Sequence, residues 1–170
     1  MAAQRIDVDD YQEVRERLVF HSDIPKANVH PWSPVDDDPP GHTYEALLKA
    51  KLAERPVEMQ RLDYAILGLQ ADGGVAAITP TSEVAHDRHV GLVKGPDDQR
   101  WLTLGLDILS QARLISIVAA GNAMAPTVEL VRAMTASGAE DLPILGISST
   151  SGGHLKWYLD REACPSEESA

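Results

Sequence analysis

Two apolar runs, each followed by a glycine-containing turn, constrain the fold of this chain more than any other feature. The runs are "LDYAILGL" at residues 62–69 and "LISIVAA" at residues 114–120. Nearly continuous apolar runs of this length are typical of parallel strands that are covered on both faces. Segments with helical spacing alternate with them, at 10–20, 43–53 and 126–136. The sequence therefore predicts an α/β domain with three α/β/α layers around a mostly parallel, Rossmann-like sheet.

The remaining segments complete a single-domain prediction for residues 1–170. Thr43 is expected to cap the helix at 43–53. The proline- and aspartate-rich stretch 30–42 is expected to be a solvated loop, and residues 161–170 a frayed tail. Further short strands are predicted in "HVGLVKG" at 89–95, at the start of "WLTLGLDILSQA" at 101–112, in "PILGISS" at 143–149 and in "LKWYLD" at 155–160.

Composition and charge limit the classes of function. The 170 residues carry a formal net charge of −11 with a pI of about 4.8, which disfavours nucleic acids and anionic membranes as partners. A small anionic ligand stays compatible, because a few cations can reverse the local field. Cys164 is the single cysteine, so no disulfide can form within the chain. The sequence shows no signal peptide or membrane-spanning run, and we expect a cytoplasmic protein without metal or cofactor.

The stretch "GLQADGGVAAITP" at residues 68–80 is the first candidate site, because it follows the apolar strand at 62–69. α/β proteins usually place their chemistry at the carboxyl ends of parallel strands. Asp72, Gly73 and Gly74 suit a tight turn, since aspartate and glycine tolerate unusual backbone angles. Apart from Asp72, the stretch contains no charged group and no histidine. Its position indicates an active site, and its side chains do not.

Four collinear segments resemble the 6-phosphogluconolactonase family, within the wider group that includes glucosamine-6-phosphate deaminase. They are "DYQEVRERL" with "IPKANVH", "LDYAILGLQADGGVAAITP", "LTLGLDILSQARLISIVAAGNAMA" and "GGHLKWYLDREA". The resemblance implies the family's α/β fold and its reaction, the hydrolysis of 6-phosphogluconolactone in the pentose phosphate pathway, with a sugar phosphate as ligand. It also implies that the family's first strand–loop–helix region has no counterpart in these residues.

The family's functional positions are substituted in this sequence. The catalytic histidine of the family aligns with Gly74, and the lysine expected to hold the phosphate aligns with Met124. The arginine that opens a family strand falls on Trp101, with Arg100 next to it. Arg113 matches a family position at a strand start, where a structural salt bridge is at least as plausible as a substrate contact. The resemblance thus implies a catalytic position at Asp72, Gly73 and Gly74, and a substrate-binding position at Arg100, Arg113 and Met124.

The substitutions affect both requirements of lactone hydrolysis. A base that removes a proton from the attacking water contributes about 10²–10⁴-fold to the rate. Histidine suits this role because its ordinary pKa is about 6.5, whereas glycine has no titratable group. Asp72 could replace it only if burial raised the pKa of its carboxyl. A phosphate needs backbone N–H groups and a cation, and Met124 supplies no charge. We therefore expect impaired or absent catalysis.

Three functions remain open at this point. An active lactonase would need a base from elsewhere, such as His86, His89 or His154. A non-catalytic binding or regulatory protein would use the preserved scaffold, with an exposed sheet edge or face that favours a homodimer or another protein partner. A sugar-phosphate binder without turnover would need cations near the old pocket, and those available are Lys94, Arg100, Arg113 and Lys156.

Overall fold

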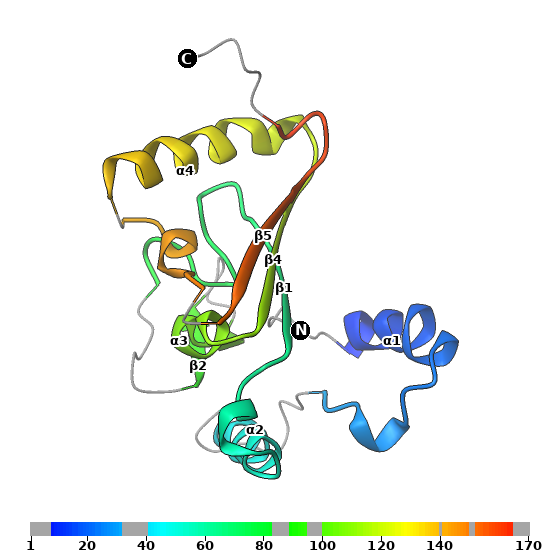
Figure 1. Ribbon diagram of the computed structural model, residues 1–170. Coiled ribbons are helices and arrows are strands. Elements are labelled where there is room, and N and C mark those ends of the chain that lie inside the picture. The colour runs from blue at the N-terminus through cyan, green and yellow to red at the C-terminus, as the bar shows by residue number, and fades with distance from the viewer. Residues whose placement is uncertain are drawn as a thin grey trace.

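The two apolar runs form neighbouring strands of one parallel sheet. The computed structural model describes residues 8–31, 41–82, 89–94, 100–139, 141–149 and 152–164. Strands β1 (Tyr64–Gly68), β4 (Leu114–Ala119) and β5 (His154–Leu159) pair in parallel in the order β1-β4-β5. The predicted α/β fold with a mostly parallel sheet is confirmed (Figure 1).

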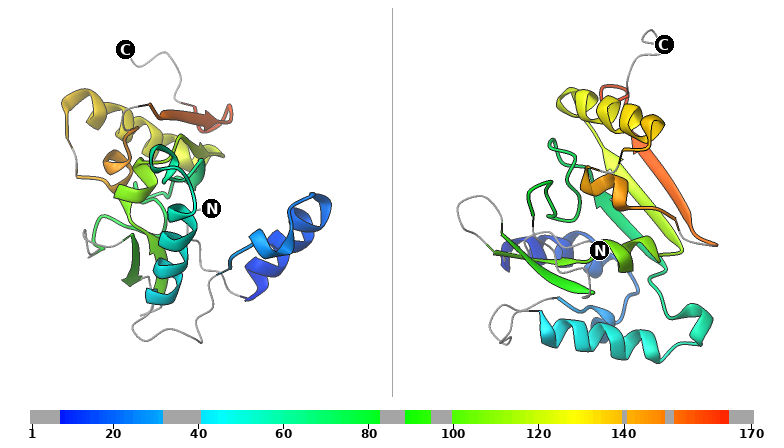
Figure 2. Two further views of the ribbon diagram at one scale, coloured as in Figure 1. Left: turned by 60° about the horizontal axis from the view of Figure 1, so that its bottom comes forward. Right: turned by 90° about the vertical axis from the view of Figure 1, so that its left-hand side faces the viewer.

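The helices in the second half of the chain lie to one side of this sheet. Helix α4 (Ala125–Ser137) follows β4 through the short helix η5 (Asn122–Met124), and it lies on the same side as α3 (Leu106–Ser110) and η6 (Pro143–Gly146) (Figures 1 and 2). Helix α2 (His42–Ala53) and η3 (Val57–Met59) precede β1. The first described elements are α1 (Val8–Arg17), η1 (Val19–His21) and η2 (Lys26–Asn28), which stand apart from the sheet in Figure 1.

A second, smaller sheet contains the strands predicted at 89–95 and at the start of 101–112. Strands β2 (Val90–Lys94) and β3 (Arg100–Leu104) pair in an antiparallel hairpin, with Val90 opposite Leu104. Val90, Val93, Leu102 and Leu104 are buried. The strand positions are confirmed, whereas their separation from the parallel sheet was not predicted.

Two local predictions are wrong. Residues 143–146 form η6 rather than a strand, because Pro143 has no N–H group to donate and the turn buries Ile144. Thr43 lies inside α2, and the residue at the N-cap is Gly41 in a left-handed conformation with φ 89°. The carbonyl oxygen of Gly41 accepts the N–H of Glu45 at 2.8 Å.

Two further predictions fall largely outside the described residues. Of the expected loop at 30–42, residues 32–40 are not described. Of the expected frayed tail, residues 165–170 are not described, and residues 161–164 form a turn that buries Ala163. Among the described residues, no helix combines the length and apolarity that a membrane-spanning segment needs.

The core lies between the parallel sheet and the helices on one side of it. One face of the sheet carries Ala65, Leu67, Ile115 and Ile117, each at most 1% exposed. Against this face pack the buried side chains of α3 and α4, which are Ile108, Leu109, Val128 and Val131. Complete burial of a Leu or Ile side chain stabilises the fold by about 1.5–3 kcal/mol, so this face carries most of the stability of the sheet.

The opposite face of the parallel sheet is open. Tyr64, Ile66, Val118 and Tyr158 are 46%, 51%, 39% and 50% exposed. Ser116 is buried beneath them, and its hydroxyl lies 2.9 Å from the hydroxyl of Tyr64. Among the described residues, the expected covering of both sheet faces is therefore met on one face only.

Candidate functional site

The candidate loop lies where the carboxyl ends of β1 and β4 meet. The N–H of Leu69 donates to the carbonyl oxygen of Val118 at 2.9 Å, which continues the β1–β4 pairing by one residue. Residues 70–74 then form a tight turn, in which Gly73 N–H donates to Gln70 O at 3.0 Å and Gln70 N–H donates to Gly74 O at 2.9 Å. The loop therefore has the position that α/β proteins use for binding and catalysis.

A second tight turn follows at once. Val75 and Ile78 exchange two backbone hydrogen bonds, at 3.0 and 2.9 Å. Between them Ala76 and Ala77 are both left-handed, with φ 54° and 63°. Positive φ at both central residues defines a type I′ turn, and each alanine costs about 1–3 kcal/mol there. The hydroxyl of buried Thr103 donates to the carbonyl of Ala76 and so holds the turn in place.

Gly74 lies where these two turns close on each other. A Cβ atom at this position would come within 2.6 Å of the carbonyl oxygen of Ile78, and within 2.8 Å of the Asp72 carboxylate. Real Cβ atoms essentially never approach a neighbour so closely, and Ile78 O is a backbone atom that the turn fixes. The loop therefore has no room for any side chain at residue 74 in this conformation.

Asp72 and Gly73 shape the turn. The Oδ1 atom of Asp72 accepts the N–H of Gly74 at 2.9 Å, while the residue itself is exposed. Gly73 is left-handed at φ 80°, and a Cβ there would meet the Leu142 side chain at 2.8 Å. Its carbonyl oxygen accepts the N–H of Ile144 from η6 at 3.2 Å. Both residues thus have structural contacts that explain their identity without any catalytic role.

The start of α4 lies against the same loop. The hydroxyl of Thr127 donates to the carbonyl oxygen of Ala71 at 2.7 Å. Met124, one turn earlier, is half-buried and packs against the hydrophobic core. The structure therefore brings Asp72, Gly73, Gly74 and the α4 start together, and the side chain at position 124 fills apolar space.

A carboxylate stabilises the neighbouring strand ends. Asp160 follows β5, and its two oxygens accept the N–H groups of Ala163 and Gly121, both at 2.8 Å. These hydrogen bonds, first from Ala163 and then from Gly121, lower the pKa of the Asp160 carboxyl below its ordinary value. Asp160 thereby ties β5 to the turn that leads from β4 into α4.

The candidate cations are not gathered at this loop. Arg113 precedes β4, and its Nη1 atom lies 3.3 Å from Asp63 Oδ1 at the amino ends of the strands. The structural salt bridge considered for Arg113 is therefore present. Lys156 lies in the middle of β5. Arg100 begins β3 and Lys94 ends β2, but the side chains of both lie outside the described part of the structure.

The candidate replacement bases are equally dispersed. His154 begins β5 in the same row as Tyr64, four rows before Gly68 and thus about 13 Å of strand rise from the loop edge. The backbone N–H of His89 donates to Glu45 of α2 at 3.2 Å, before β2 begins. His86 lies outside the described residues. In the described ranges, no three histidine, cysteine or acidic side chains gather as metal ligands would.

A surface hollow of about 560 Å³ lies elsewhere, over the first turns of α2. It is lined by His42, Thr43, Glu45, Ala46 and Lys49. The buried Glu45 carboxylate accepts the backbone N–H of His89, and Lys49 Nζ lies 3.0 Å from it. Since these contacts connect α2 to β2, Glu45 has a structural role, and the hollow contains none of the residues that carry the family resemblance.

Sequence reasoning missed the residues that hold the loop from outside. Thr103, Thr127 and Leu142 contact the loop from three other elements, at separations of 27 residues or more for the two threonines. No local pattern marks such contacts. The left-handed alanines at 76 and 77 were also missed, because glycine or asparagine usually occupies such positions.

The fold and the loop define an α/β protein whose candidate site follows the first strand of a parallel sheet. The sequence profile of the glucosamine-6-phosphate isomerases/6-phosphogluconolactonase family matches residues 6–157. The chain therefore belongs to this family.

Individual relatives agree with this assignment. The chain is 26% identical to the 6-phosphogluconolactonase of Mycobacterium tuberculosis over 168 residues, and 28% identical to that of Synechocystis sp. over 163 residues. These alignments cover 92% and 93% of this chain, and 66% and 67% of the relatives. An alignment to the human GDH/6PGL endoplasmic bifunctional protein covers 91% of this chain and 20% of that protein. The chain thus spans about two thirds of the bacterial relatives.

Solved structures show the same fold. A devB protein superposes with a TM-score of 0.75 at 27% identity, covering 90% of this chain and 64% of the other. The 6-phosphogluconolactonase from Trypanosoma cruzi superposes with a TM-score of 0.70 at 20% identity, covering 95% of this chain and 69% of the other.

Proposed function

We propose that this chain is a 6-phosphogluconolactonase-like protein that has kept the family scaffold and lost lactonase turnover. The observation that carries the proposal is the closed loop around Gly74, where a Cβ would lie 2.6 Å from Ile78 O. The resemblance aligns this residue with the catalytic histidine of the family. The loop therefore does more than lack an imidazole at residue 74, because its shape leaves no room for one.

The acid–base chemistry of the loop supports the proposal. Asp72 is the single titratable residue between 68 and 80, it is exposed, and its Oδ1 already accepts the Gly74 N–H. An exposed carboxylate that already bonds the loop backbone is placed to shape the turn rather than to remove a proton from an attacking water. His154 lies at the opposite ends of the strands.

The expected phosphate contacts support it as well. The position aligned with the family lysine is Met124, which is half-buried and packs against the core. Arg113 is engaged with Asp63 at the amino ends of the strands, whereas the loop follows their carboxyl ends. A dianionic ligand at the loop would therefore lack the charge-assisted bonds that usually hold phosphate. The cytoplasmic location and the link to the pentose phosphate pathway, expected from sequence, belong to the same proposal.

The test is hydrolysis of 6-phosphogluconolactone by the purified chain, measured against the spontaneous reaction. The M. tuberculosis relative, assayed in parallel, shows that the assay detects catalysis. We expect the chain to leave the spontaneous rate unchanged. A rate above background that scales with protein concentration, and that persists after repurification, would refute the loss of turnover.

A further inference from the structure

The second turn of the candidate loop is built on two left-handed alanines. Ala76 and Ala77 occupy the central positions of the type I′ turn between Val75 and Ile78, with φ 54° and 63°. Glycine and asparagine usually occupy such positions, because a Cβ atom disfavours the left-handed backbone. The local sequence therefore does not select this turn, and contacts from elsewhere in the fold must hold it.

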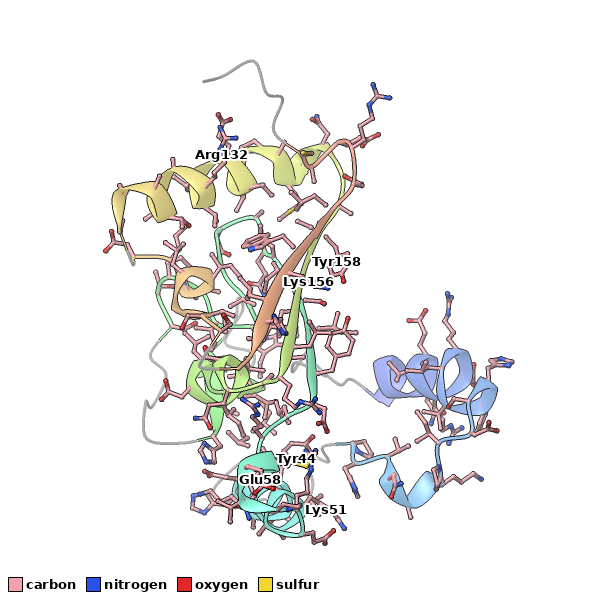
Figure 3. All side chains as sticks on the ribbon, viewed as in Figure 1. Tyr44, Lys51, Glu58, Arg132, Lys156 and Tyr158 are labelled. Atoms are coloured by element: carbon pink, nitrogen blue, oxygen red, sulfur yellow. The ribbon has the colours of Figure 1, made fainter. Side chains whose placement is uncertain are left out.

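The contact at the centre of the turn comes from the β2–β3 hairpin. Thr103 of β3 is 0% exposed, and its hydroxyl donates to the carbonyl oxygen of Ala76, which is 6% exposed. The same hydroxyl lies 3.2 Å from the carbonyl oxygen of Leu104, the longer of its two contacts. In Figure 3 the loop lies on the α4 side of the parallel sheet, whereas Lys156 and Tyr158 project from the other side. The contact therefore belongs to the packed part of the described structure.

The carbonyl group that Thr103 holds is the one that decides the type of the turn. It belongs to the middle peptide, which joins Ala76 to Ala77. Rotation of this peptide by about 180° converts a type I′ turn into a type II′ turn, in which only the first central residue keeps a positive φ. Because the rotation would aim the Ala76 oxygen away from Thr103, the hydroxyl fixes the peptide in its I′ orientation.

The turn also positions the oxygen atom that closes over Gly74. The carbonyl oxygen of Ile78 accepts the N–H of Val75 at 3.0 Å, and it lies 2.6 Å from where a Cβ of residue 74 would be. A change in the turn therefore moves this oxygen relative to Gly74. Three successive contacts thus connect the Thr103 hydroxyl, through Ala76 and Ile78, to the closed position at residue 74.

We propose that Thr103 acts as a conformational latch of the candidate loop. Its hydroxyl selects the I′ form of the turn, and the β2–β3 hairpin thereby determines whether the backbone closes around Gly74. When the hydroxyl is removed, the turn opens locally while the sheet stays folded. The latch concerns the conformation of the loop, so it holds whether or not the chain hydrolyses a lactone.

The first test measures hydrogen exchange of the Val75 and Ile78 amides, which donate across the turn, relative to the Leu69 amide, which belongs to the sheet. This ratio reports local opening, because loss of global stability affects all three amides. Thr103→Val removes the hydroxyl and keeps the branched shape. It should raise the ratio about tenfold or more, as expected when a buried carbonyl loses its donor. Thr103→Ser is the matched control, since it keeps the hydroxyl, and it should leave the ratio unchanged.

The second test asks whether the hydroxyl fixes the middle peptide. Ala76→Gly permits a II′ turn, which takes glycine at its first central position, whereas Ala77→Gly suits the I′ turn and serves as the control. Proton distances from nuclear magnetic resonance distinguish the two forms. The amide protons of residues 76 and 77 are close in I′, and the α-proton of 76 is close to the amide proton of 77 in II′.

The latch predicts a II′ turn in the double variant Ala76→Gly/Thr103→Val. It predicts a I′ turn in Ala76→Gly alone, where the hydroxyl still holds the peptide, and in Ala77→Gly/Thr103→Val, where an alanine at the first central position disfavours II′.

Three results would overturn the latch. The first is an exchange ratio that Thr103→Val leaves unchanged, which would mean that packing alone holds the turn. The second is a raised ratio in Thr103→Ser, which would assign the effect to the packing of residue 103. The third is a II′ turn in Ala76→Gly alone, or a I′ turn in its combination with Thr103→Val. The results for Thr103→Ser and for Ala76→Gly alone decide the question even if Thr103→Val does not fold.

Discussion

Gly74 shows how much a single residue can decide about this site. The two turns of the loop close around its α-carbon, so that three oxygen atoms lie within 2.8 Å of where a Cβ would be. Gly68, six residues earlier in β1, has nothing within 4 Å of its own Cβ position. The fold therefore requires glycine at position 74, whereas it only tolerates glycine at position 68.

Gly74→Ala should lower the free energy of unfolding by about 1–3 kcal/mol, because the methyl group forces the Ile78 carbonyl or the Asp72 carboxylate to move. Gly68→Ala is the control. It should be neutral or stabilise by up to about 1 kcal/mol, since alanine reduces the entropy of the unfolded chain. Urea unfolding of both variants measures the difference. Equal effects of the two substitutions would show that the loop around Gly74 is not closed.

At the residue scale, a motif match singled out positions whose functional role stays a prediction. Gly74 and Met124 were identified by resemblance, and the structure explains both as packed positions rather than as vacant ones. Thr103 and Thr127 could not be found, because each is defined by a hydrogen bond to a carbonyl of the distant loop. A hydrogen bond between residues far apart in the chain cannot be recognised from the spacing of residues in either segment.

At the scale of elements, Asp160 joins the end of β5 to the turn between β4 and α4. Its carboxylate accepts two backbone N–H groups, and these bonds lower its pKa in the folded chain. A lowered folded pKa stabilises the fold above the ordinary value of 3.8, and this contribution is lost as the pH falls through the folded value.

Asp160→Asn should therefore destabilise the chain at neutral pH, since bonds to a neutral amide oxygen are weaker than bonds to a carboxylate. The difference in stability between the variant and the unchanged chain should stay constant at pH values well above 3.8 and shrink as the pH falls below 3.8. Urea midpoints across this range measure it. A difference that stays constant with pH would show that the charge of Asp160 does not contribute.

Elements with long sequence patterns were predicted better than elements with short ones. The long apolar runs gave β1 and β4, and helical spacing gave α1, α2 and α4. Residues 143–149 were misread as a strand, because a short apolar run does not reveal that Pro143 starts a turn. The antiparallel pairing of β2 with β3 depends on contacts that neither segment encodes alone.

At the scale of the whole molecule, the described residues pack against one face of the sheet and leave the other face open. The sequence run 114–120 led us to expect two covered faces, and Val118 at 39% exposure shows otherwise. An apolar residue at a strand position signals that a surface is to be buried, without saying whether the same chain or a second copy buries it.

The central claim is that the closed backbone of residues 70–78 prevents catalysis, in addition to the absence of an imidazole. The most direct measurement is the rate of 6-phosphogluconolactone hydrolysis by Gly74→His, beside the unchanged chain and the spontaneous reaction. The account predicts that all three rates agree, because a histidine at residue 74 disrupts the turn instead of facing a substrate. A rate about tenfold or more above background, toward the 10²–10⁴-fold that a positioned base supplies, would contradict it.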